Sequence, residues 1–409
     1  MDTKTFDILL FGATSFVGQI VTKCLFDEIG LSQDIKWAIA GRSETKLRAL
    51  KATLGDAAKD LPVIVADSSD SDSLNAMCRQ SRVILSTIGP YALYGEPLIK
   101  ACVENGNDYC DLTGEAYWIK RMMDRYESAA KASGARIVNC CGFDSIPSDL
   151  GVHFLQQVGA KKFGQFFDRV SLRVKAMKGG ASGGTIASVI EMFIAAKADP
   201  ELRRAMGNPY MLCPEDHSYK NKQTRIKGPI YDKDFHCWSA PFIMEAINAR
   251  VVLRSNALLK MAYGDNFSYG EGMLTGKGKK GYLRAFGLSL GLASFALGIM
   301  LKPVRKLMQR FLLPKPGEGP SQQQQADGYF DIRILGTNNR HQARIKVSGD
   351  RDPGYGCTAK MLTQAGLCMA FDIAKSDLSG GFWTPATAMG DALIERLSNS
   401  AGMSFELED

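Results

Sequence analysis

The sequence has few of the residues that build metal centres and disulfide frameworks. It contains four histidines, scattered singly, and its ten cysteines include no Cys-x-x-Cys pair. Zinc sites need clustered histidine and cysteine ligands, and secreted disulfide scaffolds need patterned cysteines. Asp2 and Asp7 interrupt the start of the chain, so no secretory signal is expected. We therefore predict no metal, and a cytoplasmic protein with reduced thiols.

Acidic residues are absent from one long stretch, between Glu271 and Glu318. The net charge of the chain is +7, and this stretch alone carries nine basic residues, so the remainder of the chain is slightly acidic. The nine are Lys277, Lys279, Lys280, Arg284, Lys302, Arg305, Lys306, Arg310 and Lys315. Because the positive charge is confined to one zone, we predict no nucleic-acid partner.

Inside this basic zone, residues 285–301 carry no charge. The segment has about the minimum length of a membrane-spanning helix, and its basic flanks suit anionic lipid headgroups. Three interpretations stay open: a membrane-surface anchor or lipid-access helix, a helix buried in the core or in a homodimer, and a membrane span. Residues 314–325, rich in Pro, Gly and Gln, predict a flexible linker.

The first part of the chain alternates short apolar runs with amphipathic stretches. Such alternation predicts an α/β fold, a Rossmann-type doubly wound parallel sheet. Six strands are expected at residues 7–11, 36–40, 62–66, 82–87, 108–112 and 136–140. Glycine and polar residues follow each run, at the carboxyl edge where such sheets bind ligands.

The first apolar run leads into the loop Gly12–Gly18, followed by an expected helix over residues 17–29. A strand, a glycine turn and a helix N-terminus together suit a pyrophosphate, so we assign Gly12, Thr14, Ser15, Phe16 and Gly18 to cofactor binding. The spacing departs from the usual fingerprint, because Ser15 stands where related loops carry a middle glycine. The loop alone equally suits an ordinary strand-to-helix turn.

The second strand indicates which dinucleotide binds. NAD-specific folds carry an acidic residue about 20 residues after the glycine loop, to hold the ribose 2′-hydroxyl. Here Gly41, Arg42 and Ser43 stand at that distance, with Lys46 one turn on. A guanidinium pairs with a 2′-phosphate, so the sequence predicts NADP(H). The alternative is that Arg42 and Lys46 are solvated helix residues. Asp67, after the third strand, is expected on the adenine side.

Short-chain dehydrogenases, which share this fold, use a tyrosine followed four positions later by a lysine. No tyrosine of this sequence has such a lysine, so that mechanism is excluded. Gly89 and Pro90 follow the fourth strand and are assigned to cofactor binding. Tyr91 and Tyr94, just beyond them, are candidate proton donors. The alternative is that both tyrosines only pack beneath the nicotinamide.

Two carboxylates follow the fifth and sixth strands. Glu115 is assigned to cofactor binding, with a favourable position in the first turn of its helix as the alternative. Asp144 is assigned as catalytic, although Asp144 and Ser145 precede Ile146-Pro147 and suit a helix N-cap equally well.

Beyond residue 147 the pattern changes to mixed helices and strands. A hairpin is expected where residues 329–335 and 342–347 flank a turn. We predict a Rossmann domain over 1–147 and a substrate or dimerisation domain of α+β type over 148–325, which residues 326–409 complete.

Several motifs together resemble the saccharopine dehydrogenase-like oxidoreductase family, which includes the trans-acting enoyl reductases of polyketide-lipid assembly. They are Gly12–Gly18, Ala40–Ser43, Gly89–Tyr91, Tyr94–Pro97, Cys141–Asp149, Gly183–Thr185, Val251–Ser255 and Trp383–Ala386. The resemblance implies an NAD(P)-dependent oxidoreductase and, for the enoyl reductases, reduction of a C=C bond in a lipid intermediate. An apolar or lipid-linked small-molecule substrate is thus expected. The alternatives are an amino-acid or imine dehydrogenase, and a membrane- or lipid-associated nucleotide-binding protein without catalysis.

Overall fold

The protein is described by a computed structural model covering residues 4–32, 34–179, 190, 192–194, 197, 199–311 and 319–408. The predicted motif Gly183–Thr185 and the first part of the predicted linker lie outside these residues. The chain divides into two compact units. The first unit comprises residues 1–143, 317–319 and 354–401, and the second comprises residues 144–316, 320–353 and 402–409.

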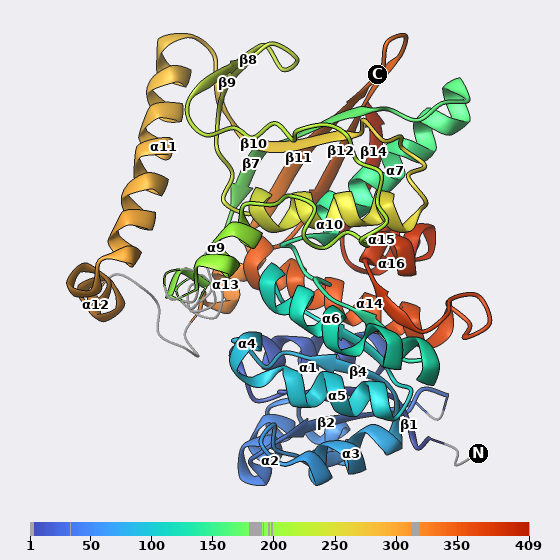
Figure 1. Ribbon diagram of the computed structural model, residues 1–409. Coiled ribbons are helices and arrows are strands. Elements are labelled where there is room, and N and C mark those ends of the chain that lie inside the picture. Colours follow the sequence, from blue (N-terminus) through green and yellow to red (C-terminus); the bar gives the residue numbers. More distant parts are fainter. Residues whose placement is uncertain are drawn as a thin grey trace. The chain divides into compact units, whose positions relative to one another are not determined.

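The first unit is built on a parallel sheet (Figure 1). Within the described residues its order is β3-β2-β1-β4-β5-β6-β13. The strands are β1 Phe6–Phe11, β2 Trp37–Gly41, β3 Val63–Val65, β4 Ser81–Ser86, β5 Asp108–Asp111, β6 Arg136–Val138 and β13 Gly381–Trp383. The order runs outward from β1 in both directions, as in a doubly wound dinucleotide-binding fold. The predicted Rossmann-type sheet is confirmed, and its six expected strands are all present.

Helices cover both faces of this sheet. They are α1 Phe16–Ile29, α2 Glu44–Thr53, α3 Ser71–Gln80, α4 Tyr91–Tyr94, α5 Glu96–Glu104, α6 Ala116–Ser133, α14 Thr358–Phe371, α15 Pro385–Ala388 and α16 Gly390–Ser400. Helices α3, α5 and α6 pack in series, whereas α14 packs against α1 and strands β1, β4 and β5. Because the crossovers are right-handed, α1 and α2 cover one half of one face of the sheet, and α14 covers the other half of that face.

This return of the chain differs from the predicted domain division. Residues 326–409 were expected to complete the second domain, but β13 pairs in parallel with β6, and residues 354–401 belong to the first unit. This segment forms helices α14, α15 and α16. These helices pack against the first unit because part of the face of its sheet would otherwise be uncovered. Local sequence patterns do not reveal such an uncovered face.

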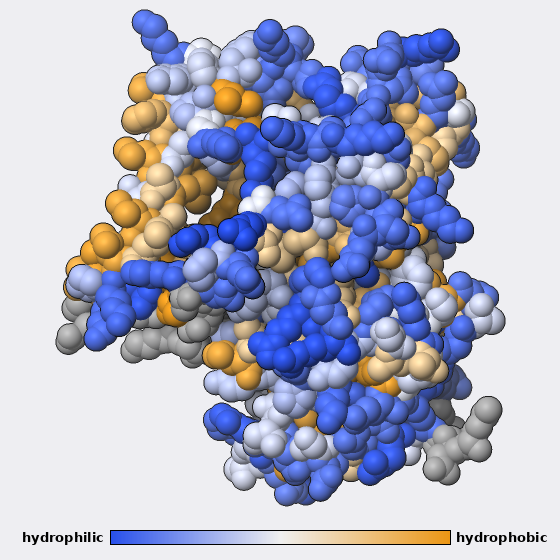
Figure 2. All heavy atoms as spheres, in the orientation of Figure 1, coloured by the Kyte–Doolittle hydropathy of each residue, from blue (hydrophilic) through white to orange (hydrophobic). Residues whose placement is uncertain are grey.

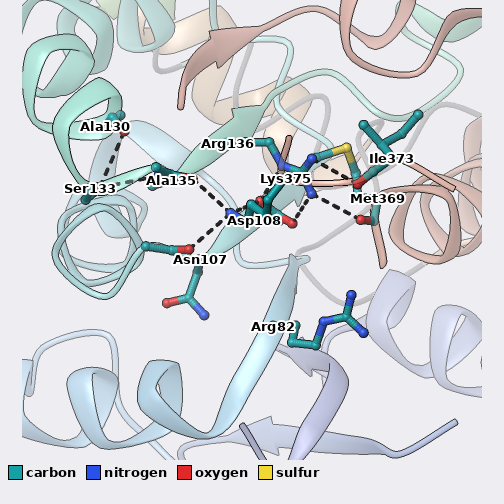
Figure 3. Close-up of polar contacts among 12 residues, drawn as sticks. Arg82, Asn107, Asp108, Ala130, Ser133, Ala135, Arg136, Met369, Ile373 and Lys375 are labelled. Carbon is teal, nitrogen blue, oxygen red and sulfur yellow. Dashed lines mark hydrogen bonds and ion pairs between the residues drawn. The ribbon is translucent and has the colours of Figure 1, made fainter. Parts of the chain in front are cut away.

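A buried ion pair joins the amino ends of β5 and β6 (Figure 3). Arg136 Nε and Nη2 donate to the two carboxylate oxygens of Asp108 at 2.8 and 2.5 Å. Arg136 Nη1 donates to the carbonyls of Ile373 and Ala374, each at 3.0 Å, and Lys375 Nζ donates to Asp108 at 2.7 Å. The network thereby fastens the segment after α14 to the sheet.

The second unit contains a mixed sheet of order β14-β12-β11-β7-β10-β9-β8 within the described residues. The strands are β7 Arg169–Lys178, β8 Ile230–Asp232, β9 Cys237–Ala240, β10 Ser268–Gly276, β11 Tyr329–Thr337, β12 Gln342–Gly349 and β14 Met403–Glu408. Its helices are α7 Ile146–Phe163, α9 Pro200–Met206, α10 Glu245–Leu258, α11 Gly278–Met300, α12 Lys302–Phe311 and α13 Gln322–Ala326. The predicted α+β architecture and the β11–β12 hairpin are confirmed. The predicted linker over 314–325 is wrong at its end, because Ser321 caps α13.

Helix α11 contains all of the predicted apolar segment 285–301 except Leu301, which caps it, and this helix is mostly exposed. By length and composition it is one helix that could cross a membrane, yet only 17% of its apolar window is buried, and such a helix alone is weak evidence of a span. Figure 2 shows hydrophobic side chains, in orange, along α11 at the left of the molecule. The interpretation as a helix buried in the core of this chain is therefore wrong.

Candidate active site

The glycine loop after β1 is closed by two glycines that no other residue can replace without strain. Gly12 has φ of +90°, and a Cβ there would lie 2.6 Å from Cγ1 of Ile88. A Cβ on Gly18 would lie 2.2 Å from the carbonyl oxygen of Gly12. Both positions therefore need glycine, the first for its backbone conformation and the second for close packing of α1 on the loop.

Ser15 explains why the middle position of this loop needs no glycine. Its φ is −67°, and its hydroxyl caps α1 by accepting from the N–H of Gly18 at 2.9 Å. The same hydroxyl donates to Thr87 Oγ1 at 3.1 Å, and Thr87 donates to the Gly12 carbonyl at 2.9 Å. Serine thus ties the loop to the end of β4. Sequence reasoning did not identify Thr87 as a residue that holds the glycine loop.

The start of α1 leaves backbone donors free. Among the described residues, the N–H groups of Thr14, Phe16 and Val17 find no acceptor. They stand at the positive end of a 14-residue helix. Free N–H groups on a helix N-terminus suit a phosphate, so this loop fits the pyrophosphate of a dinucleotide.

Arg42 follows β2 directly and has no hydrogen-bond or ion-pair partner in the described part of the chain. Ser43 caps the next helix, α2, by accepting from the N–H of Lys46 at 3.4 Å. Asp67 accepts from the backbone and the hydroxyl of Ser69, which lowers the pKa of its carboxyl, and the charge of Arg42 lowers that pKa further. An exposed guanidinium beside a helix N-terminus fits a 2′-phosphate.

Tyr91 and Glu115 hold the loop after β4 together. The Glu115 carboxylate accepts from the N–H groups of Tyr91 and Ala92 at 3.0 and 2.8 Å, which caps α4. The Tyr91 hydroxyl donates to the Ser86 carbonyl at 3.0 Å and accepts from the N–H of Leu112 at 3.1 Å. Burial raises the pKa of Tyr91 well above its ordinary value. This bonding argues against Tyr91 as a proton donor and explains Glu115 as a structural residue.

Tyr94 differs from Tyr91. It lies at the end of α4, follows the cis peptide bond Gly89–Pro90 by a few residues, and is 48% exposed. Within the described residues its hydroxyl has no hydrogen-bond partner. Of the two predicted tyrosines, Tyr94 is the one whose hydroxyl is available to a ligand.

A buried carboxyl that sequence reasoning missed lies at the end of β5. Asp111 accepts hydrogen bonds from Tyr109 at 3.0 Å, from the Asn139 side chain at 2.8 Å, and from the N–H groups of Thr113 and Cys140, each at 3.1 Å. Burial raises the pKa of Asp111 to about 6 despite these donors. The bond to Cys140 holds a non-glycine residue at φ of 64°, which fixes the end of β6.

The second unit begins with Asp144. Its carboxyl has no hydrogen-bond or ion-pair partner among the described residues, and burial alone raises its pKa to about 6. The interpretation of Asp144 and Ser145 as a side-chain cap of α7 is wrong. Ser145 occupies the N-cap position, but its hydroxyl donates instead to Asn248 at 3.2 Å. A raised pKa without a structural partner is typical of a functional carboxyl.

A buried polar cluster supports the start of α7 within the second unit. Glu271 on β10 accepts from Tyr269 at 2.5 Å, from Ser148 at 2.7 Å and from the Asn248 side chain at 3.0 Å. Burial raises the pKa of Glu271 to about 7. No spacing signal in the sequence joins residues this far apart, so the cluster could not be predicted.

The comparisons with known proteins agree with this geometry. Residues 8–138 match the family model described as the saccharopine dehydrogenase NADP-binding domain. A protein of Mycobacterium tuberculosis, provisionally named a trans-acting enoyl reductase, is 40% identical over 416 residues, covering 98% of this chain and 97% of the relative. The chain belongs to the saccharopine dehydrogenase-like oxidoreductase family.

Further relatives and one solved structure place this family member more closely. The trans-acting enoyl reductases of Mycobacterium bovis and Mycobacterium ulcerans are 36% and 35% identical, covering 96% of both chains in each case. The apo saccharopine dehydrogenase of Saccharomyces cerevisiae superposes with a TM-score of 0.54 at 12% identity, over 99% of this chain and 100% of that one, which shows the shared fold. The protein is an enoyl-reductase-like oxidoreductase with an NADP-binding domain.

Proposed function

We propose that this protein uses NADPH to reduce the carbon–carbon double bond of an apolar or lipid-linked enoyl substrate. The reaction class is supported by relatives named trans-acting enoyl reductases, at 35–40% identity along nearly the whole chain. The choice of NADPH rests on one observation above the others. Arg42, which has no hydrogen-bond or ion-pair partner among the described residues, presents its guanidinium where an NAD-specific protein would carry a carboxylate.

In this proposal, different residues of the first unit hold different parts of the cofactor. Gly12, Gly18 and the free N–H groups of Thr14, Phe16 and Val17 hold the pyrophosphate. The 2′-phosphate is held by Arg42, Ser43 and Lys46, with Asp67 on the adenine side and Gly41 leaving room for the ribose. Gly89 and Pro90 flank the nicotinamide, which supplies a hydride when bound.

Saturation of a double bond also consumes a proton, which this chain must deliver. Asp144 is our first candidate, because its raised pKa of about 6 keeps part of the population protonated near neutral pH. Tyr94 is the second, because its hydroxyl is exposed and unpartnered within the described residues. Glu115 and Tyr91 serve to shape the loop that carries Tyr94.

A reductase assay tests the proposal directly. The purified protein is mixed with NADPH and either a short or a long trans-2-enoyl thioester, and NADPH is followed by its near-ultraviolet absorbance. We expect oxidation of NADPH together with a product that mass spectrometry shows to have gained two hydrogen atoms, faster with the longer chain. Binding of NADPH without turnover of any enoyl thioester would contradict the proposed reaction. Oxidation of saccharopine with NADP⁺ would instead favour the amino-acid dehydrogenase alternative.

We further propose a cytoplasmic location for this reaction, because all ten cysteines are free thiols in the structure and nine of them are buried. The predicted homodimer stays a prediction, to be tested by sedimentation of the full chain. The predicted membrane contact through residues 285–301 can hold or fail independently of the catalytic activity.

A further inference from the structure

We propose that α11 and α12 form a peripheral anchor that lies on the surface of an anionic lipid bilayer. This inference goes beyond the proposed reaction and requires neither cofactor nor substrate. It rests on three features of the second unit: an exposed apolar face, a one-sided charge distribution, and the way α12 follows α11.

The apolar face consists of Leu283, Phe286, Leu290 and Leu297. Their exposed fractions are 64, 48, 55 and 59%. Spacings of three, four and seven residues put these side chains on one face of the helix. On the opposite side only the two ends of the helix are covered: Ala285 and Ile299 are fully buried, whereas Leu288 between them is exposed. An apolar face of this size that no described residue covers indicates an interaction surface.

The charged residues that flank this face along the chain are all basic. Lys277, Lys279, Lys280 and Arg284 are exposed at the N-terminal end, and none pairs with a carboxylate among the described residues. Lys302 and Lys306 are exposed beyond the C-terminal end. Basic side chains near a membrane surface attract anionic headgroups while an adjacent apolar face enters the acyl region. Charge and hydrophobicity thus select the same partner, an anionic bilayer.

Two further observations favour a surface position over a membrane span. The uncharged segment 285–301 is about 26 Å long as a helix, shorter than a hydrocarbon core of about 30 Å. Helix α12 starts immediately after Leu301, and Arg305 Nη1 donates to the Ile299 carbonyl at 3.3 Å. The bases of α12 therefore stay next to the end of α11, together with the exposed Val304 and Leu307.

A second copy of the chain is a less favourable partner for the apolar face of α11 than an anionic bilayer is. Both ends of α11 are basic, so any pairing of two such helices, parallel or antiparallel, brings like charges together. A bilayer surface containing anionic lipid has no such conflict. The rival interpretation remains measurable, because it predicts a change in the mass of the particle without lipid.

Vesicle flotation of the full-length protein tests the anchor. Vesicles of phosphatidylcholine alone are compared with vesicles that also contain phosphatidylserine, at low and at high salt. We expect binding only to the anionic vesicles and release at high salt, as electrostatic attachment requires. Binding that is equal on both vesicles, or that resists high salt and alkaline extraction, would overturn the peripheral anchor.

Matched variants separate the two contributions. Phe286→Ser/Leu290→Ser removes apolar area, and Lys279→Glu/Lys280→Glu reverses charge. Each pair should lower partitioning onto anionic vesicles by a factor on the order of ten or more. Ile243→Ser and Lys222→Glu/Lys227→Glu change exposed residues of the same unit elsewhere and should leave partitioning unchanged. Circular dichroism checks that each variant is folded.

Two results would contradict the assignment. One is equal partitioning of the α11 variants and their controls. The other is a lipid-free dimer that Phe286→Ser/Leu290→Ser dissociates, because it would assign the apolar face to a second copy. Reductase activity on a soluble thioester should not change in the α11 variants, so failure of the anchor and failure of the proposed reaction are distinguishable.

Discussion

An arginine at the amino ends of the parallel strands and an arginine at their carboxyl ends differ in burial and in hydrogen bonding. At the amino edge, Arg136 is buried and uses its guanidinium on Asp108 and on carbonyls of the chain after α14 (Figure 3). At the carboxyl edge, Arg42 is exposed and has no partner among the described residues. Arg136 is the first residue of β6 and Arg42 directly follows β2 of the same sheet, yet among the described residues only Arg136 finds partners.

The difference separates structural charges from binding charges. A buried charge costs free energy unless it is paired and hydrogen-bonded, so Arg136 can be tolerated only as part of its network. An exposed guanidinium without a partner costs little and remains available to an anion. We therefore expect substitutions at the amino edge to change stability and substitutions at the carboxyl edge to change ligand binding.

The largest effect is expected for Arg136→Met. Removal of the guanidinium leaves the buried Asp108 carboxylate with Lys375 alone and frees the carbonyls of Ile373 and Ala374. The free energy of unfolding should fall by about 3–5 kcal/mol, measured by urea denaturation.

The control for this variant is Arg48→Met. Arg48 pairs with Glu44 on an exposed helix face, where such a pair contributes about 0.5 kcal/mol at most. If Arg136→Met cost no more than Arg48→Met, the amino-edge network would not be structural. The double variant Arg136→Met/Asp108→Leu should recover part of the loss, since it removes the unpaired charge.

Arg42→Ala tests the other side of the comparison. Loss of a charge-assisted contact with the 2′-phosphate should weaken NADPH binding by about 10- to 100-fold, measured by fluorescence titration. NADH binding and the melting temperature should stay nearly unchanged, because Arg42 makes no hydrogen bond or ion pair with any described residue. Arg48→Ala, a residue of α2 farther from the loop, is the matched control. Equal weakening of NADPH and NADH would show that Arg42 does not read the 2′-phosphate.

The sheet could be predicted because its signals are local. Each of its first six strands is a short apolar run followed by glycine or polar residues, and these runs do form β1 to β6. The position of β13 could not be predicted in the same way. Gly381–Trp383 joins the sheet only because β6 leaves an open edge, and α14 covers its face only because that half is bare. Tertiary packing decides both.

The candidate site shows the same limit. The loop around Ser15 and the position of Arg42 follow from spacing along the chain. The bonding of Tyr91 does not, because its partners are the carbonyl of Ser86 and the N–H of Leu112, on two different strand ends. Asp111 was missed for the same reason, since its donors come from β5 and from the segment after β6. Sequence identifies chemically able residues but not which of them the fold has already used.

Asp144→Asn is expected to change stability less than Arg136→Met does and in the opposite direction, because it should stabilise the protein. Its pKa is raised from 3.8 to about 6, so the folded protein binds more protons than the unfolded chain between those pH values. Stability must therefore fall as pH rises through this window, and the asparagine variant escapes the loss. Above pH 6 the variant should be more stable than the parent, by at most the roughly 3 kcal/mol that a shift of about two pKa units represents, while enoyl reduction falls.

Measurements of unfolding and turnover between pH 5 and 8 decide the role of Asp144. A variant that is both less stable and less active would make Asp144 a structural carboxyl like Glu115. A variant that is more stable with unchanged turnover would remove it from the proton-transfer proposal. Only the combination of higher stability and lower turnover supports the assignment.

The smallest effect is expected for Ser15→Gly, which restores the glycine of related loops. Glycine replaces a serine N-cap at a cost of a few tenths of a kcal/mol, whereas Ser15→Ala should cost about 1 kcal/mol. The φ of −67° at this position gains nothing from glycine, and the bond from Ser15 to Thr87 is lost in both variants. NADPH affinity should therefore change little in Ser15→Gly, measured by the same titration as for Arg42→Ala. A large gain in affinity would mean that the Ser15 hydroxyl obstructs the pyrophosphate rather than ordering the loop that receives it.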